Sequence, residues 1–274
     1  MDNELLVTTC ASSNELDRAL RILDSANMAY RRIDPTPPLA LVGVPALIVD
    51  RETRVQLEEA EPQVVFSGWV EHREAGAQMP EGSEPDVGTC FQRAAIMVLG
   101  PCVADDTKIR LVAHLRGNLA PVLPYLNAVI PTACFTPAAD TLTYMQGHRM
   151  IALYAQRITI AKADEIVDAW LCLDGIRKWA EETWANRARI EPCYQIRKKP
   201  PALEIYKRLP GTNCGLCGER TCMAFALRLW AGAVSVRRCA PVLLPEHRTR
   251  KAALLAICSS LGVSDAQASE GEDE

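Results

Sequence analysis

Four cysteines near the C-terminal end have the types and the spacing needed to bind a metal centre. Cys214, Cys217, Cys222 and Cys239 follow the pattern C-x2-C-x4-C-x16-C. A cubane iron–sulfur cluster needs one thiolate per iron, so four such ligands satisfy a [4Fe–4S] cluster. Four cysteines also bind zinc, usually as two close C-x2-C pairs, whereas this segment has one such pair. The spacing therefore favours the cluster, with zinc or unliganded thiols as the alternatives.

The residues around these cysteines are suited to enclosing a small cluster. Gly211, Gly215 and Gly218 lie in the loop of the first three cysteines, and glycine reaches positive φ freely. A helix is predicted over 222–233, with Thr221 as its N-cap. Its apolar residues at i, i+3, i+4 and i+7 are Met223, Ala226, Leu227 and Trp230. We expect this face to cover the cluster and to limit its contact with water.

Residues 200–242 resemble the small [4Fe–4S] domain of the corrinoid iron–sulfur protein large subunit, which also occurs in the B subunit of Rnf electron-transport complexes. The resemblance is carried by residues 202–210, Asn213, Gly215, Gly218, Thr221, residues 224–226, Gly232 and the four cysteines. It implies that the cysteines are cluster ligands and that the domain transfers single electrons to a neighbouring centre, such as a corrinoid cobalt. The large barrel of that family has no counterpart here, so electron transfer carries over better than methyl transfer.

Composition limits the class of protein. The chain has 274 residues, of which 49% are hydrophobic, and a net charge of −4, so it can bury a sizeable core and is a poor general binder of nucleic acids or membrane surfaces. Its eleven cysteines are odd in number and lack the spacing of a secreted disulfide scaffold. No apolar run approaches the ~20 residues of a membrane span, and the first residues lack a signal-type basic region. We expect a cytoplasmic protein with no membrane segment and no nucleic-acid partner.

The remaining sequence predicts a mixed α/β, or α+β, fold. Residues 1–75 predict a βαβ unit with a further strand: strands over 5–9, 28–33 and 44–49, a helix over 14–26, then a short helix over 51–60 and a strand over 64–70. This order resembles the start of a thioredoxin-like fold, with Cys10 at a redox position and Ser13 where the second redox cysteine would stand. We weigh a reactive thiol against a buried apolar cysteine at Cys10 and favour the buried one.

Residues 76–89 are polar, contain Gly76, Pro80, Gly82 and Pro85, and predict a linker. His72, just before them, is expected to be solvated. Residues 90–187 predict a curved antiparallel sheet backed by a long helix over 163–187. The predicted strands cover 94–99, 109–115 and three short segments between 141 and 161, with a helix over 119–128. This topology is similar to one half of the TATA-binding-protein fold, but we identify no basic stripe on the strands and expect no DNA binding.

The other cysteines form no C-x2-C pair. Cys90, Cys102 and Cys134 fall in loops or at strand ends and could converge on a second metal site, although core or incidental positions are the favoured interpretation. The same holds for Cys172 and Cys193.

The C-terminal third is divided into a stiff basic linker over 188–201, the cluster domain over 202–242, and a helix with an acidic tail over 243–274. The helix is predicted over 245–261 and contains Cys258. Several basic residues gather in this third: Lys198, Lys199, Arg208, Arg237, Arg238, Arg248, Arg250 and Lys251. We favour a solvated surface for them over a docking patch for an acidic redox partner.

The leading hypothesis is an iron–sulfur protein that transfers electrons to a partner metalloenzyme or corrinoid protein. No P-loop, G-x-G-x-x-G motif or nucleophile elbow indicates a catalytic site elsewhere, so we lean away from an enzyme. The alternative is an assembly or maturation factor that delivers a cluster or metal. A third hypothesis makes the cluster structural and gives ligand binding to the upstream domains.

Overall fold

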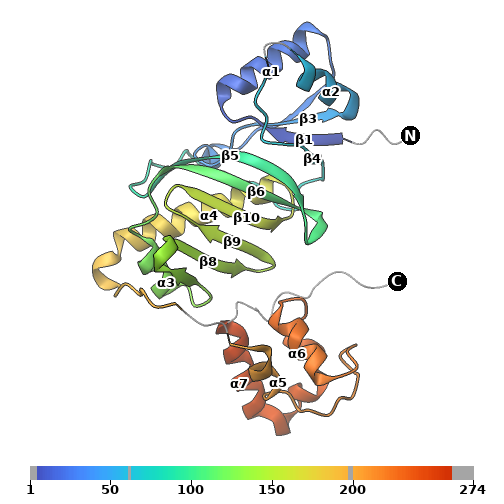
Figure 1. Ribbon diagram of the computed structural model, residues 1–274, viewed down its shortest axis with the longest axis vertical. Coiled ribbons are helices and arrows are strands. Elements are labelled where there is room, and N and C mark those ends of the chain that lie inside the picture. Colours follow the sequence, from blue (N-terminus) through green and yellow to red (C-terminus); the bar gives the residue numbers. More distant parts are fainter. Residues whose placement is uncertain (1–4, 61–62, 197–199, 261–274) are drawn as a thin grey trace.

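The structure, a computed structural model, describes residues 5–60, 63–196 and 200–260. Two antiparallel sheets follow one another along the chain, and a helical segment comes after them (Figure 1). The α+β class predicted from the sequence is confirmed. Within the described ranges, no helix is both long enough and apolar enough to cross a lipid bilayer.

The first sheet has the strand order β2-β3-β1-β4, and each neighbouring pair is antiparallel. Its strands are β1 (Leu5–Thr9), β2 (Arg31–Ile33), β3 (Ala46–Asp50) and β4 (Val70–Glu71). The helix α1 (Ser13–Ser25) joins β1 to β2, which run parallel with β3 between them, so the predicted βαβ unit forms in a split arrangement. The short 3-10 helix η1 (Pro37–Leu39) and the helix α2 (Arg51–Glu59) complete this part.

Local sequence explains where these two helices begin. The Ser12 hydroxyl accepts the N–H of Glu15 at 3.3 Å, and the Asp50 carboxylate accepts the N–H of Thr53 at 2.8 Å. Each side chain satisfies one of the N–H groups that a first helical turn leaves without a partner. The apolar residues of α1 then face the sheet at helical spacing, with Leu16 and Leu23 buried.

The sequence predicts a strand over 64–70, but only β4 and a single bridge between Cys10 and Phe66 form there. The Ser67 carbonyl instead accepts the N–H of Leu99 from the second sheet at 2.7 Å. A Cβ on Gly68, which has φ 124°, would stand 2.2 Å from the Leu99 carbonyl oxygen. The Ser67 N–H still donates to the Thr9 carbonyl at 2.9 Å, so the segment bonds to both sheets and forms no continuous strand with either.

His72 follows directly on β4, and the expectation that it is solvated is wrong. Its side chain is 10% exposed, and its backbone N–H donates to the Leu5 carbonyl at 2.8 Å. The backbone of His72 thus extends the pairing of β4 with β1, and its imidazole is largely shielded from water.

The second sheet has the strand order β5-β6-β10-β9-β8-β7. Its strands are β5 (Phe91–Cys102), β6 (Asp105–Gly117), β7 (Cys134–Thr136), β8 (Thr141–Gln146), β9 (Arg149–Leu153) and β10 (Arg157–Ala163). The helix α3 (Leu123–Val129) and the 3-10 helix η2 (Pro137–Ala139) lie in the connections, and α4 (Ile166–Ala185) runs across one face before the 3-10 helix η3 (Arg187–Arg189). The predicted sheet backed by one long helix is confirmed.

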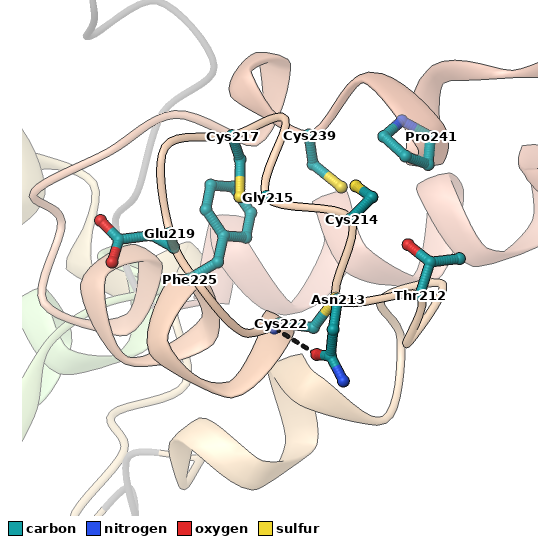
Figure 2. A pocket seen from close by; sticks show the side chains of 10 residues that line it. All are labelled: Thr212, Asn213, Cys214, Gly215, Cys217, Glu219, Cys222, Phe225, Cys239 and Pro241. Atoms are coloured by element: carbon teal, nitrogen blue, oxygen red, sulfur yellow. Dashed lines mark hydrogen bonds between the residues drawn. The ribbon is translucent and has the colours of Figure 1, made fainter.

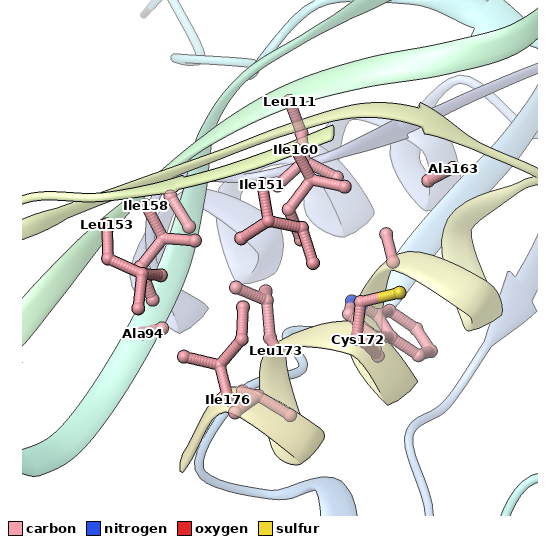
Figure 3. Packing of buried hydrophobic residues seen from close by; sticks show 14 of the residues in the cluster. Ala94, Leu111, Ile151, Leu153, Ile158, Ile160, Ala163, Cys172, Leu173 and Ile176 are labelled. Atoms are coloured by element: carbon pink, nitrogen blue, oxygen red, sulfur yellow. The ribbon is translucent and has the colours of Figure 1, made fainter. Parts of the chain in front are cut away.

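The core of this part lies between the sheet and α4. Figure 3 shows Leu111, Ile151 and Ile160 pointing from the strands toward Leu173 and Ile176 of the helix. All five are buried. Alternate residues of each strand face the helix because strand side chains alternate between the two faces of a sheet, so the remaining positions of the strands face away from α4.

One hydrophobic cluster contains residues from both sheets. Val7 and Ile48 of the first sheet belong to the same buried cluster as Phe91 and Trp170. The N–H of Ala94 also donates to the Leu41 carbonyl at 2.8 Å. The boundary that the sequence predicts over 76–89 is therefore crossed by a shared core.

The predicted linker over 188–201 starts as ordered structure against α3. The Asn127 side-chain amide donates to the carbonyls of Cys193 and Gln195, at 2.8 and 3.2 Å. The N–H of Cys193 donates to the Pro124 carbonyl at 3.0 Å. The basic pair Lys198 and Lys199 lies outside the described residues.

The C-terminal segment has its own small core. Its elements are α5 (Ala202–Tyr206), α6 (Cys222–Trp230), η4 (Val236–Arg238), η5 (Ala240–Leu243), η6 (Pro245–His247) and α7 (Arg248–Ser260). Ile205, Phe225, Leu229, Val242 and Leu254 form the centre of a buried cluster that includes no residue of the two sheets. Among described residues, the hydrogen bonds and ion pairs of 200–260 stay within this segment.

Candidate metal centre

The four cysteines singled out by their spacing line one pocket (Figure 2). Cys214 and Cys217 come from the loop between α5 and α6, Cys222 is the first residue of α6, and Cys239 directly follows η4. The other lining residues are Thr212, Asn213, Gly215, Glu219, Phe225 and Pro241. The fold thus brings four thiols from separate positions in the sequence to one place.

The loop reaches this shape through residues in the left-handed region of φ. Gly211 and Gly215 have φ values of 76° and 75°, and a Cβ on either would meet nothing within 4 Å. The need for glycine there is therefore one of backbone conformation and not of space. Asn213, at φ 47°, adopts the same region, and its Oδ1 accepts the N–H of Cys222 at 2.8 Å. That bond ties the start of the loop to the start of α6.

The helix α6 begins as predicted, but a different face is buried. The Thr221 hydroxyl accepts the N–H of Ala224 at 3.1 Å, which confirms the N-cap. Leu227 of the predicted apolar face is 53% exposed. The buried residues are Cys222, Phe225, Ala226 and Leu229, which have the same i, i+3, i+4, i+7 spacing one residue earlier. Phe225, which lines the pocket, is therefore the apolar residue that the predicted face missed.

The four thiols differ in exposure and in their electrostatic surroundings. Cys222 and Cys239 are buried, Cys217 is half-buried and Cys214 is exposed. Burial, followed by the neighbouring thiols, raises the pKa of Cys239. The backbone N–H of Leu216, followed by the Thr212 hydroxyl, lowers the pKa of Cys214. The pocket thus has a buried side and an open side at Cys214.

The donor set fits an iron–sulfur cluster. Four thiols match one ligand per iron of a cubane, and the N–H of Leu216 is a donor directed at sulfur. Across the ranges that the structure describes, no three His, Cys, Asp or Glu side chains lie close enough together to hold a single metal ion. A tetrahedral zinc ion would use the same four thiolates, so metal and sulfide analysis separates the two centres.

Most of the remaining candidate cysteines are buried thiols. Burial raises the pKa of Cys10 to about 12, of Cys90 to about 11 and of Cys172 to about 12. Cys10 is 1% exposed, in agreement with the favoured interpretation of a buried apolar residue. Cys102 is also buried and Cys134 is partly exposed, and none of these cysteines belongs to a group of three potential metal ligands among the described residues.

Two of the basic residues of the C-terminal third, Arg208 and Arg250, have local partners. Arg208 forms an ion pair with Glu204 at 2.9 Å, and Arg250 donates to the Leu209 carbonyl at 2.8 Å. Arg238 is exposed beside the cysteine loop, where its Nη2 lies 3.6 Å from the position a Cβ on Gly218 would take. This supports a mainly solvated and structural role for the set, with Arg238 as the basic residue next to the pocket.

Comparison with known proteins identifies the segment that holds the four cysteines. Residues 209–241 match the family model described as "Putative Fe-S cluster". The acetyl-CoA decarbonylase/synthase complex subunit gamma of Methanosarcina acetivorans is 47% identical over 53 residues, which are 19% of this chain and 11% of that protein. The corrinoid/iron-sulfur protein large subunit of Moorella thermoacetica is 57% identical over 37 residues, which are 14% of this chain and 8% of that protein.

The resemblance predicted for residues 200–242 is confirmed, and the chain carries an iron–sulfur cluster domain. The match spans about a tenth of the length of these relatives. No solved structure matches the chain.

Proposed function

We propose that this iron–sulfur protein transfers electrons, with Cys214, Cys217, Cys222 and Cys239 holding one [4Fe–4S] cluster. The observation that supports the proposal is that four thiols line a single pocket within the segment that matches the iron–sulfur family. When bound, a cluster of this kind supplies one-electron transfer at a potential set by its surroundings.

The residues around the pocket have distinct parts in this proposal. The buried Phe225 and the partly buried Pro241 both line the pocket and exclude water from parts of it. The N–H of Leu216 donates toward Cys214 and stabilises negative charge on sulfur. Because Cys214 is exposed, a partner protein docked there would come close to the site.

The partner in this proposal is a metalloenzyme or a corrinoid protein. The relatives with matching segments are a subunit of an acetyl-CoA decarbonylase/synthase complex and the large subunit of a corrinoid/iron-sulfur protein. From these relatives we carry over to this chain only the class of partner, because the matching segment is limited to the iron–sulfur cluster domain. A cytoplasmic location accompanies the proposal, since the thiols have to remain reduced.

Anaerobic purification with iron and sulfide analysis tests the cofactor. We expect about four irons and four sulfides per chain and an S = 1/2 EPR signal after reduction with dithionite. The Cys217→Ser variant should lose the signal, whereas the matched control Cys193→Ser, outside the pocket, should retain it. One zinc per chain with no sulfide would refute the cluster.

The exposure of Cys214 also bears on the second candidate, a factor that delivers its cluster to another protein. An open ligand is the point at which an acceptor thiol could attack. Mixing the loaded protein with an apo-ferredoxin separates the two functions. A cluster that stays in place through repeated reduction and oxidation supports electron transfer, and transfer to the acceptor supports delivery.

A further inference from the structure

The second sheet has one face that α4 does not cover, here called the open face. Its residues are those that alternate with the buried core positions of β5, β6, β9 and β10. On β6, for example, Leu111 and Ala113 are buried, whereas Arg110 and His114 are exposed. The open face is therefore accessible over several adjacent strands.

Basic side chains gather on this face. Five exposed residues share it: Arg93 on β5, Arg110, His114 and Arg116 on β6, and Arg157 on β10. The strand register sets Arg93 directly opposite Arg116, and His114 opposite Arg157. The sequence-based expectation of no basic stripe overlooked β6, where every second residue faces outward.

These arginines have no acidic partners among the residues that the structure describes. No ion pair involves Arg93, Arg110, Arg116 or Arg157 there, whereas Arg149 and Arg177 in the same part of the chain bind carboxylates at 2.7 Å. Like charges directly opposite each other on a sheet are destabilising. The open face thus retains an arrangement of charge that the fold itself does not neutralise.

Exposed apolar side chains lie beside the basic residues on the same face. Val98 and Met150 on this face are 51% and 53% exposed, and the half-buried Thr159 and Ala161 lie on β10, the strand between β6 and β9. Arginine and methionine are both enriched in protein–protein interfaces. Arginines beside exposed apolar side chains match the composition of such an interface.

We propose that the open face is a docking site for an acidic protein surface. Carboxylates of the partner would pair with the arginines, and apolar partner side chains would cover Val98 and Met150. A single-stranded nucleic acid fits less well, because its bases stack on aromatic side chains and the outward positions of β5, β6 and β10 carry none. The ring of Tyr154, next to Arg157, is already covered by that guanidinium at 4.1 Å. The acidic chain, with a net charge of −4, also opposes a general nucleic-acid binder.

Fluorescence anisotropy with two labelled probes of equal charge tests this proposal on the full chain. The probes are a polyglutamate peptide and a single-stranded DNA oligonucleotide. We expect salt-sensitive binding of polyglutamate that weakens at least about tenfold in Arg110→Glu/Arg116→Glu. The matched control Arg21→Glu/Arg189→Glu, which reverses two exposed charges away from this face, should bind as the wild type does.

Two further measurements make the result decisive. Circular dichroism should show that both double charge-reversal variants are folded, since Arg116→Glu turns the like-charge pair of Arg93 and Arg116 into a pair of opposite charges. The neutral variant Arg110→Gln/Arg116→Gln should lose part of the polyglutamate binding. The Cys217→Ser variant should bind polyglutamate normally, because the open face does not depend on the cluster. Tighter binding of DNA than of polyglutamate, equal loss in the control, or self-association that buries the face would overturn the proposal.

Discussion

Asn213 contributes to the metal centre through both its backbone conformation and its side-chain hydrogen bond. Its backbone adopts φ 47°, and its side-chain oxygen accepts the N–H of Cys222 at 2.8 Å. Asn213→Gly keeps the backbone freedom but loses the hydrogen bond, whereas Asn213→Ala loses both. We expect iron release to a chelator to be slowest in the wild type, faster in the glycine variant and fastest in the alanine variant.

The magnitudes support this order. A hydrogen bond of this kind contributes about 0.5–1.5 kcal/mol, and holding alanine at positive φ costs about a further 1–3 kcal/mol. Timed absorbance of the iron–chelator complex measures the rates. Equal rates of iron release in the two variants would mean that only the hydrogen bond contributes. If both variants released iron at the rate of the wild type, Asn213 would have no part in holding the iron.

His72 gives the fold a pH dependence. Burial, assisted by the charge of Arg31, lowers the pKa of His72 in the folded state, so the unfolded state, with a pKa of about 6.5, binds the proton more tightly. The free energy of unfolding should therefore fall as the pH drops from about 7 to about 5. Urea titrations across this range should show a flatter dependence for His72→Gln, and parallel curves for the two proteins would contradict the assignment.

The sequence predicted single residues well where they act through local spacing. The four cysteines and the Thr221 cap follow from short-range patterns, and they occupy the expected places. Phe225 was missed because two overlapping sets on α6 share the same helical spacing, and only packing selects between them. The burial of His72 depends on its contact with the distant Leu5, which no local pattern encodes.

At the scale of elements, Glu181 of α4 fixes where β5 begins. Its carboxylate accepts the N–H groups of Cys90 and Phe91, both at 2.7 Å, and that of Thr89 at 2.9 Å. A Cβ on Gly88 would lie 2.3 Å from this carboxyl group, so the chain needs glycine to pass. One side chain thus joins the long helix to the first strand of the second sheet.

Removing this carboxylate should destabilise the sheet domain. Glu181→Ala leaves three backbone N–H groups without their acceptor, so we expect a loss of about 2–4 kcal/mol in the free energy of unfolding. Urea denaturation measures it, with the exposed neighbour Glu182→Ala as the matched control. If the two variants were equally stable, water would be replacing the carboxylate, and the contact would not define the start of β5.

Elements with a strong internal period were predicted from the sequence, and those set by distant contacts were not. The long helix and five of the six strands of the second sheet have clear apolar patterns and were predicted, whereas the short β7 (Cys134–Thr136) was not. The strand predicted over 64–70 does not form as a continuous strand. The Ser67 carbonyl accepts the N–H of Leu99, and Gly68 lies close to the Leu99 carbonyl. Insertion of β3 between β1 and β2 is likewise a property of the assembled sheet.

At the scale of the whole molecule, the three buried hydrophobic clusters predict two separate unfolding events, because two of them share the first sheet and the third lies in the C-terminal segment. The hydrophobic cluster with residues from both sheets shares no residue with the hydrophobic cluster that includes Phe225 and Leu254. Ligands that bind only a folded state stabilise that state alone. We therefore expect calorimetry of the iron-loaded protein to show two transitions, and removal of iron by a chelator to lower the temperature of one of them only.

The Cys217→Ser variant assigns the transitions, because it should lose the iron-dependent one without any chelator. The Glu181→Ala variant should lower the other transition and leave the iron-dependent one in place. A single transition, or two that shift together on iron removal, would show that the C-terminal segment depends on the sheets for its stability. Independent transitions would instead support a cluster-binding unit attached to a separate body, whose open face is then free to bind a partner of its own.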